Sequence, residues 1–147
     1  MSKFNHYDTV WVNGCFDILH VGHIRMLEYA SSLGGRMVVG VDTDERIKSL
    51  KGESRPVNTL EDRMEVLRSL RHVDVAVPFE SEEQLIALLC EFRPVCRVLG
   101  SEYRDLPIVG AEFSGKIKFF DRISFWYHIF CWFFNIFSYL KMEKRNP

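Results

Sequence analysis

Four short runs rich in β-branched residues constrain the fold of this chain more than any other feature. They are TVWV at 9–12, MVVGV at 37–41, VDVAVPF at 73–79 and RVLG at 97–100. Apolar runs of this length are typical of strands buried on both faces of a parallel sheet. The stretches between them show the helical spacing of apolar side chains, at 22–34, 59–73 and 81–94. This alternation predicts a doubly wound α/β fold, whose ligands bind at the carboxyl ends of the strands.

The expected helices have recognisable ends. The first runs into Gly34 and Gly35, and glycine is common just after a helix C-terminus. Thr59 and Ser81 precede the other two helices and are expected to cap them, because a hydroxyl can accept a hydrogen bond from the first turn. The charged segment 42–58 contains glycine and proline and is expected to be a loop.

Bulk charge excludes one class of function. The 147 residues carry 19 basic and 20 acidic side chains, a formal net charge of −1, so a nucleic-acid interface is not expected. An anionic ligand must instead be held by a local group of residues. The four cysteines lack the short paired spacings of a zinc site and are expected to be reduced thiols in a cytoplasmic compartment. The N-terminal residues show no apolar export signal.

The segment NGCFDILHVGH, residues 13–23, joins the first expected strand to the first expected helix. This junction is the usual anion site in such a sheet, since free N–H groups and the positive end of the helix dipole face the ligand. Gly22 lets a phosphate approach the backbone, and the imidazoles of His20 and His23 can donate to its oxygens. A lone histidine here is more simply a helix cap or a core residue. Two histidines around a glycine favour a phosphate site.

The same segment resembles the HxGH signature of the cytidylyltransferase-like nucleotidyltransferases, and the resemblance extends over residues 9 to about 123. Proteins of this Rossmann-like family join a nucleoside triphosphate to a phosphorylated small molecule and release pyrophosphate. The resemblance implies that His20 and His23 bind the triphosphate and stabilise charge on the attacked α-phosphate, with no covalent intermediate. Positioning and electrostatics generally carry such reactions. Other residues of the segment expected near the nucleotide are Gly14, Cys15, Phe16, Asp17 and Gly22.

Mg²⁺ is the expected metal, bridging the triphosphate of ATP or CTP. Asp17 has two open interpretations, an indirect ligand of this metal or a cap at the helix entry. The sequence offers no carboxylate cluster that would cage a metal, so no metal-ligating residue is assigned.

Residues further along the chain are expected to complete the site. Charged segments are usually solvated, but the position of 42–58 after a strand places Asp44 and Lys51 near a ligand, and the resemblance implies that Lys51 reaches the phosphates. Arg63 matches a family arginine and is expected either on a triphosphate oxygen or in an i, i+4 ion pair. Gly100 resembles the start of the loop that reads the nucleotide base. Many relatives have a lysine before this glycine, where this chain has Leu99.

The segments RPVN, RHVDVAVPF and YRDLPIVGAEF look most like the heptose 1-phosphate adenylyltransferase domain of lipopolysaccharide precursor synthesis. This resemblance implies a stand-alone cytoplasmic transferase that moves a nucleotidyl group from ATP or CTP to a sugar or polyol phosphate. A homodimer is expected, as is usual for such families. Two alternatives stay open: a glycerol-3-phosphate cytidylyltransferase, and a nucleotide-binding remnant without catalysis.

The sequence departs from the family after GKIKFFDRI. Residues 1–123 are expected to form the transferase domain, and 124–147 an atypical hydrophobic tail without the family's Ser-Thr-Thr-like run that binds the triphosphate. Three explanations are open: a membrane anchor, an ordinary core helix, and a shifted reading frame. A shifted frame would remove part of the triphosphate site and impair turnover.

Overall fold

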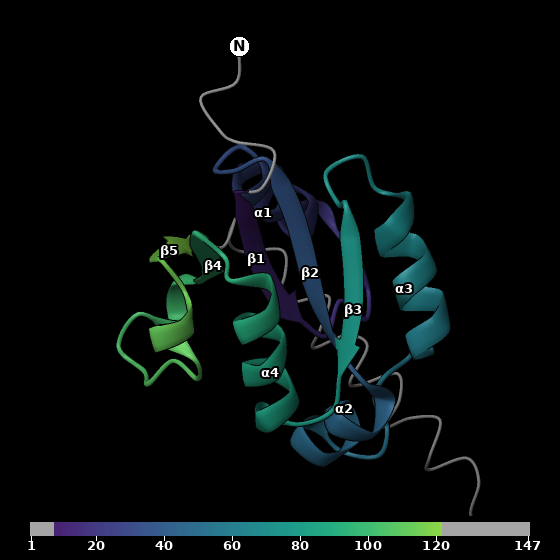
Figure 1. Ribbon diagram of the computed structural model, residues 1–147. Helices are drawn as coiled ribbons and strands as arrows, with labels where there is room; N and C mark the ends of the chain where they lie inside the picture. The colour runs from purple at the N-terminus through teal and green to yellow at the C-terminus, as the bar shows by residue number, and fades with distance from the viewer. Residues whose placement is uncertain (1–7, 122–147) are drawn as a thin grey trace, which may run out of the picture.

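The computed structural model describes residues 8–121, in which five parallel strands form a sheet in the order β3-β2-β1-β4-β5 (Figure 1). The strands are β1 (Thr9–Gly14), β2 (Arg36–Asp42), β3 (Val75–Phe79), β4 (Cys96–Gly100) and β5 (Lys116–Phe120). The helices are α1 (Val21–Ser31), α2 (Asp44–Lys51), α3 (Leu60–Ser69) and α4 (Glu82–Phe92). Two 3-10 helices follow β4, η1 (Ser101–Tyr103) and η2 (Ala111–Phe113).

Helices cover both faces of the sheet, which explains why its central strands β1 and β2 are mostly apolar and buried. Val10 and Val12 of β1 pack on one face with Leu27 of α1, in a cluster that also includes α3. Trp11 points to the other face and packs in a second cluster with Leu89 of α4. Figure 1 looks onto the α4 face, with α1 behind the strands. The expected Rossmann-like, doubly wound fold is confirmed.

Two of the expected helix caps are confirmed. Thr59 accepts a hydrogen bond from the N–H of Asp62 at the start of α3, and Ser81 accepts one from the N–H of Gln84 at the start of α4. Each cap satisfies an N–H of the first turn that has no partner within the helix.

The expected glycine cap of α1 is wrong. The helix ends at Ser31, and Ser32 caps it in a right-handed conformation, before the glycine pair is reached. Gly34 serves a close approach instead, because a Cβ there would lie 2.5 Å from Cγ2 of Val10. This position therefore lets the chain pass tightly against the start of β1.

The charged segment expected to be a loop contains α2. Thr43 caps this helix by accepting from the N–H of Arg46, and acidic residues occupy its first turn while Lys48 and Lys51 occupy its last. This distribution complements the helix dipole, which favours negative charge at the N-terminus and positive charge at the C-terminus. The loop expectation is correct only after Gly52.

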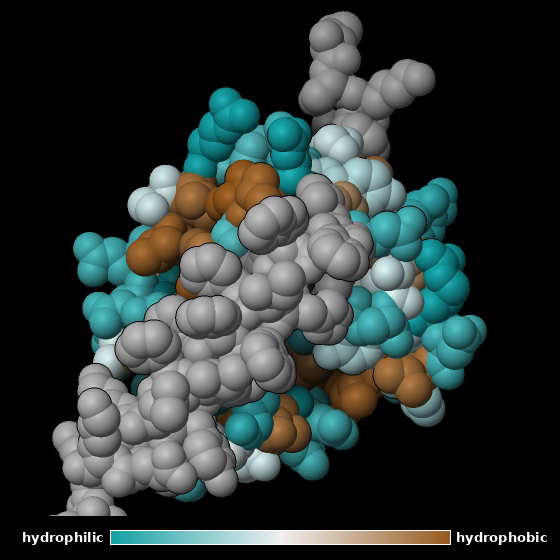
Figure 2. Space-filling model, turned by 180° about the vertical axis from the view of Figure 1, so that it is seen from behind, coloured by the Kyte–Doolittle hydropathy of each residue, from teal (hydrophilic) through white to brown (hydrophobic). Residues whose placement is uncertain are grey.

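No helix within residues 8–121 is long and apolar enough to cross a membrane. The three explanations proposed for the tail 124–147 concern residues outside the described part of the chain. Seen from behind, the coloured surface is mostly hydrophilic, with hydrophobic residues showing in several separate places (Figure 2).

The sheet opens between β1 and β4. β1 pairs with β2 from Thr9 to Gly14, but with β4 only at Val10 and Trp11. The two strands therefore part toward their carboxyl ends. The chain also reverses its direction of winding here, since β2 and β4 flank β1 on opposite sides. Such a switch point is where doubly wound folds bind their ligands.

Candidate active site

The N-terminus of α1 brings the two signature histidines together. His20 is the N-cap, and its Nδ1 accepts a hydrogen bond from the backbone N–H of His23 at 3.3 Å. The two imidazole rings lie against each other, with centroids 3.6 Å apart and 38° between their planes. Because Nδ1 of His20 accepts, the neutral ring carries its proton on Nε2. Gly22 is the second residue of the helix, between the two rings in sequence.

Phe16 packs against His23, one of these two histidines. It has a φ of 48°, in the left-handed region, and its side chain is buried. That backbone conformation costs a non-glycine residue about 1–2 kcal/mol, which burial of the ring offsets. The ring lies 5.4 Å from that of His23, and a Cβ added to Gly14 would be in ordinary contact with it at 3.5 Å. Phe16 therefore sets the position of His23 by packing.

Asp17 binds the segment that precedes α3. Its carboxylate accepts from the backbone N–H groups of Val57, at 2.9 Å and 3.0 Å, and Asn58, at 2.9 Å, and lies 3.3 Å from Nε of Arg55. Of the two interpretations of Asp17, the helix cap is wrong, because His20 caps α1, and the role of indirect metal ligand stays a prediction. The carboxylate instead fixes the loop after β1 to residues 55–58.

Arg63 joins three segments in the same way. Its side chain is only 1% exposed. Its Nη1 donates to the carbonyl oxygens of Cys15 at 2.6 Å and Asp42 at 2.8 Å, and its Nε to that of Asn58 at 3.1 Å. Nη2 donates to the Asp44 carboxylate at 2.7 Å. The ion pair thus reaches back to α2 and is not the i, i+4 pair considered from the sequence.

These contacts favour a positioning role for Arg63 over direct contact with a phosphate. They tie the ends of β1 and β2 and the start of α3 into one unit beneath the histidines. Asp44, also expected at the ligand, is the first residue of α2 and is occupied by this arginine.

Lys51 lies at the same edge of the sheet as the histidines. It is the last residue of α2 and is exposed. Burial raises the pKa of the Cys15 thiol above its ordinary value of 9.0, while the nearby Lys51 ammonium opposes this through its charge and a hydrogen bond. The thiol donates to the Asp42 carboxylate at 3.4 Å. Lys51 therefore reaches the loop after β1, and Cys15 remains neutral at pH 7.

Gly100 lies at the end of β4, on the far side of the opening between β1 and β4. A Cβ added there would meet the Glu102 carboxylate, which is the end of a flexible, exposed side chain and could move aside. The structure thus places Gly14 and Gly100 at the ends of the two strands that part.

Sequence reasoning missed Asn13 and Arg97. The Arg97 side chain is buried, and it donates through Nη1 to the Val109 carbonyl at 2.5 Å and through Nη2 to Oδ1 of Asn13 at 3.0 Å. Burial lowers the pKa of Arg97 to about 10, so the group is still charged at pH 7. The available signal was the arginine itself, because a charged residue inside an apolar strand needs partners.

The chemistry of the opening suits phosphate rather than a metal held by the protein. Within residues 8–121, no group of three or more His, Cys, Asp or Glu could hold a metal ion. The carboxylates of Asp17, Asp42 and Asp44 already accept hydrogen bonds from protein donors. Imidazoles, a helix N-terminus and an ammonium are the groups that bind anions.

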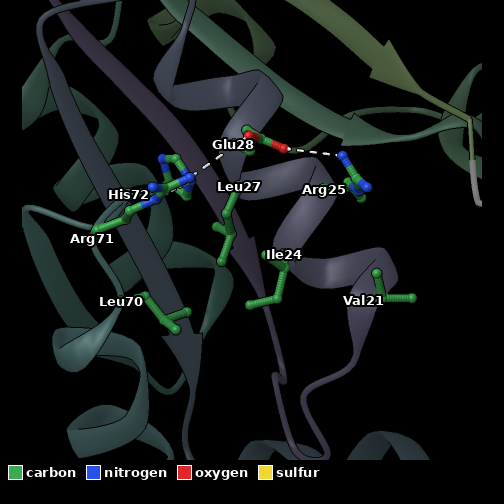
Figure 3. A pocket seen from close by; sticks show the side chains of 8 residues that line it. All are labelled: Val21, Ile24, Arg25, Leu27, Glu28, Leu70, Arg71 and His72. Atoms are coloured by element: carbon green, nitrogen blue, oxygen red, sulfur yellow. Dashed lines mark hydrogen bonds and ion pairs between the residues drawn. The ribbon is translucent and has the colours of Figure 1, made fainter.

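A separate groove of about 440 Å³ runs along α1 toward the residues that follow α3 (Figure 3). Its apolar lining is Val21, Ile24, Leu27 and Leu70. At its rim, Glu28 pairs with Arg25 at 3.6 Å and with Arg71 at 4.0 Å. His72 also lines the groove, but His20, His23 and Lys51 do not, so the groove is separate from the proposed phosphate site.

Sequence comparison identifies curated relatives of this chain. Bifunctional protein HldE of Haemophilus influenzae (strain PittEE) is 50% identical over 111 residues, which cover 76% of this chain and 23% of the relative. HldE of Sulfurimonas denitrificans is 43% identical over 118 residues, covering 79% and 24%. The chain therefore spans about a quarter of the length of these curated relatives.

A solved structure is also similar to this chain. The crystal structure of the lipopolysaccharide core biosynthesis protein from Thermoplasma volcanium GSS1 matches with a TM-score of 0.59 and 28% sequence identity, covering 79% of this chain and 95% of that one. The sequence model of the cytidylyltransferase-like family matches residues 11–129, a span that contains His20, His23, most of β1, the whole of β4 and all four α-helices. On these grounds the chain belongs to the cytidylyltransferase-like family.

Proposed function

We propose that this protein transfers a nucleotidyl group from a nucleoside triphosphate to a sugar phosphate and releases pyrophosphate. The observation that carries this proposal is the pair of contacting imidazoles of His20 and His23 at the N-terminus of α1. The pair lies where β1 and β4 part, and Lys51 is at the same edge. These groups supply positive charge and N–H donors where a triphosphate would develop negative charge.

In the proposed reaction, a phosphate oxygen of the acceptor attacks the α-phosphorus of the nucleotide. The bond from that phosphorus to the bridging oxygen breaks, and pyrophosphate leaves with the electron pair. His20 and His23 donate to the α-phosphate oxygens and stabilise the charge in the transition state. Lys51 faces the leaving pyrophosphate. None of these residues forms a covalent bond to the substrate.

Mg²⁺, when bound, would offset the negative charge of the triphosphate. The residues present fit a metal carried by the nucleotide, because the carboxylates near the site are engaged with protein donors. Asp17, Arg63 and Asp44 act on the reaction through position, by holding the loop after β1.

ATP and heptose 1-phosphate are the proposed substrates. The resemblance of the sequence to heptose 1-phosphate adenylyltransferase domains supports this choice, and the similar Thermoplasma volcanium structure is described as a lipopolysaccharide core biosynthesis protein. We further propose a cytoplasmic homodimer, as is usual for the family. CTP with glycerol 3-phosphate is the rival pair, because backbone groups near Gly100 are expected to read the base.

The test is release of pyrophosphate by the purified full chain with Mg²⁺, with ATP and CTP each paired with heptose 1-phosphate and glycerol 3-phosphate. Release with one pair names the nucleotide and the acceptor. Folded protein that binds nucleotide but is silent with all four pairs would make the chain a non-catalytic binding protein.

Two variants of His20 separate catalysis from folding. His20→Ala removes both the imidazole and the helix cap, and should cost about 1 kcal/mol of stability as well as turnover. His20→Asn keeps a good N-cap acceptor, so it should retain stability near that of the wild type and still lose turnover. Turnover of His20→Asn equal to that of the wild type contradicts the assignment.

A further inference from the structure

The side-chain amide of Asn13 is held in one orientation at the end of β1. Its Oδ1 accepts from Nε1 of Trp11 at 3.0 Å and from Nη2 of Arg97 at 3.0 Å. Indole and guanidinium nitrogens are donors only, so the oxygen of the amide, and not its NH₂, must face them. Nδ2 of Asn13 consequently points away from both partners.

Neighbouring residues hold these two donors in place. Trp11 is fully buried, and Gly40 makes room for it, since a Cβ there would lie 2.5 Å from Cζ2 of the indole. Arg97 is fixed at its other end by the carbonyl of Val109. Rotation of the Asn13 amide would therefore place its NH₂ against two donors that cannot move aside.

The amide NH₂ lies at the opening of the sheet. Asn13 pairs with Gly40 of β2, but β4 has already parted from β1 at this level. The side chain is only partly buried, and within residues 8–121 no protein group accepts a hydrogen bond from Nδ2. A donor with fixed direction thus stands on the β4 side of the histidine segment.

Arg97 gives this donor an electrostatic preference. It is charged and buried, and within residues 8–121 no carboxylate pairs with it and its Nε has no partner. A buried charge without a counter-ion is costly, and it favours an electron-rich ligand nearby. Hydrogen bonding from the guanidinium to Oδ1 also polarises the amide, which strengthens donation from Nδ2.

We propose that Asn13 is a nucleotide-binding residue, whose Nδ2 donates to an acceptor atom of the nucleotide, and that Arg97 is the positioning residue that aims it. Through Val109, Arg97 also fixes the segment between η1 and η2, so one guanidinium aligns both walls of the opening. This inference rests on the proposed function, because it assumes that a nucleotide enters here.

The decisive variant is Asn13→Asp. An aspartate keeps an oxygen that accepts from Trp11 and Arg97, and it gives Arg97 a counter-ion, so thermal stability should equal or exceed that of the wild type. The same change removes the NH₂ donor and places negative charge toward the ligand. Nucleotide Kd, measured by calorimetry on the full chain, should rise by at least about tenfold.

Gln84→Glu is the matched control. Gln84 lies in the first turn of α4, where its Oε1 accepts from the N–H of Glu80, so a glutamate keeps that bond and introduces the same charge. It follows β3, two strands away from β1. Nucleotide affinity should match that of the wild type.

Further ligands identify the acceptor atom. Loss of binding by Asn13→Asp for inorganic tripolyphosphate as well as ATP assigns the acceptor to the phosphates, whereas loss for adenosine as well as ATP assigns it to the nucleoside. Arg97→Lys keeps the charge but not the two-pronged contact, and should weaken ATP binding by a smaller factor than Asn13→Asp.

The outcomes separate this inference from the proposed function. Wild-type affinity in a folded Asn13→Asp variant overturns the role of Asn13 and leaves the transferase proposal intact. Failure of the wild type to bind ATP or CTP overturns both.

Discussion

Replacement of Arg63 by methionine should test the central structural claim about this site. Methionine keeps much of the side-chain volume but removes the four hydrogen bonds to Cys15, Asp42, Asn58 and Asp44. Three carbonyl groups and one carboxylate then lose their donor in or near the interior. Adding the free energies of four charged hydrogen bonds would overestimate the loss of stability, because the Asp44 side chain is 33% exposed and water can replace its lost donor.

The expected loss of unfolding free energy is about 3–5 kcal/mol, mainly because three backbone carbonyl groups in or near the interior lose a charged donor. With a urea dependence of about 2 kcal/mol per molar, the unfolding midpoint should fall by roughly 2 M. Urea titration followed by circular dichroism measures this shift. The variant should lose turnover as well, because the loop that carries Cys15 and leads to the histidines loses its support.

Arg71→Met is the control for this experiment. The Arg71 side chain is 82% exposed and lies 4.0 Å from Glu28, so its removal should change stability by less than about 0.5 kcal/mol. If Arg63→Met unfolds within about 1 kcal/mol of the wild type and instead shows a raised KM for nucleotide, Arg63 is a phosphate ligand and the positioning role is refuted.

Three further predictions concern the cysteines and α4. Native labelling with iodoacetamide near pH 7.5, mapped by mass spectrometry, should modify exposed Cys90 about tenfold faster than partly buried Cys15, whose pKa is raised by burial. Equal labelling rates would contradict this difference in accessibility and pKa. The raised pKa values of Cys15 and Cys96 also mean that above pH 9.0 the unfolded chain releases protons that the folded chain keeps. The stability that these two thiols contribute should therefore be fully present below pH 9.0 and be lost as the pH rises through their pKa values in the folded chain. A urea midpoint that stays unchanged up to about pH 10.5 would contradict this prediction. Arg93, the C-cap of α4, has a φ of 44° and an exposed side chain. Glycine adopts this conformation without strain, so Arg93→Gly should raise the free energy of unfolding by about 0.5–1 kcal/mol in thermal melts. A loss of stability would show that the arginine side chain makes a stabilising contact.

Features set by local sequence could be predicted. Thr59 and Ser81 cap helices because a hydroxyl three residues before a free N–H suffices to make the bond. The contact between His20 and His23 is also local, because residues three apart at the start of a helix lie on the same side of it. The order of β1 to β4 and of α1, α3 and α4 followed from the period of the apolar residues, whereas α2 was predicted as a loop.

Features set by distant contacts could not be predicted. Arg63 donates to the carbonyl of Cys15, which lies 48 positions away in the chain, and the residues around neither one indicate that contact. Arg97 stands in an apolar strand, and only the parting of β1 and β4 shows how its charge is accommodated. β5 was not recognised, because Lys116 and Lys118 alternate with its apolar residues and resemble a solvated segment.

The anchoring of Asp17 to Val57 and Asn58 affects how the protein opens. These bonds cross about 40 positions of chain, so the loop below His20 cannot detach without also releasing the segment that leads into α3. The amides of Val57 and Asn58 should therefore exchange with solvent only when α3 and the end of β1 open together, as one cooperative unit. An isolated peptide carrying the histidine signature would lack this support and could not organise an anion site.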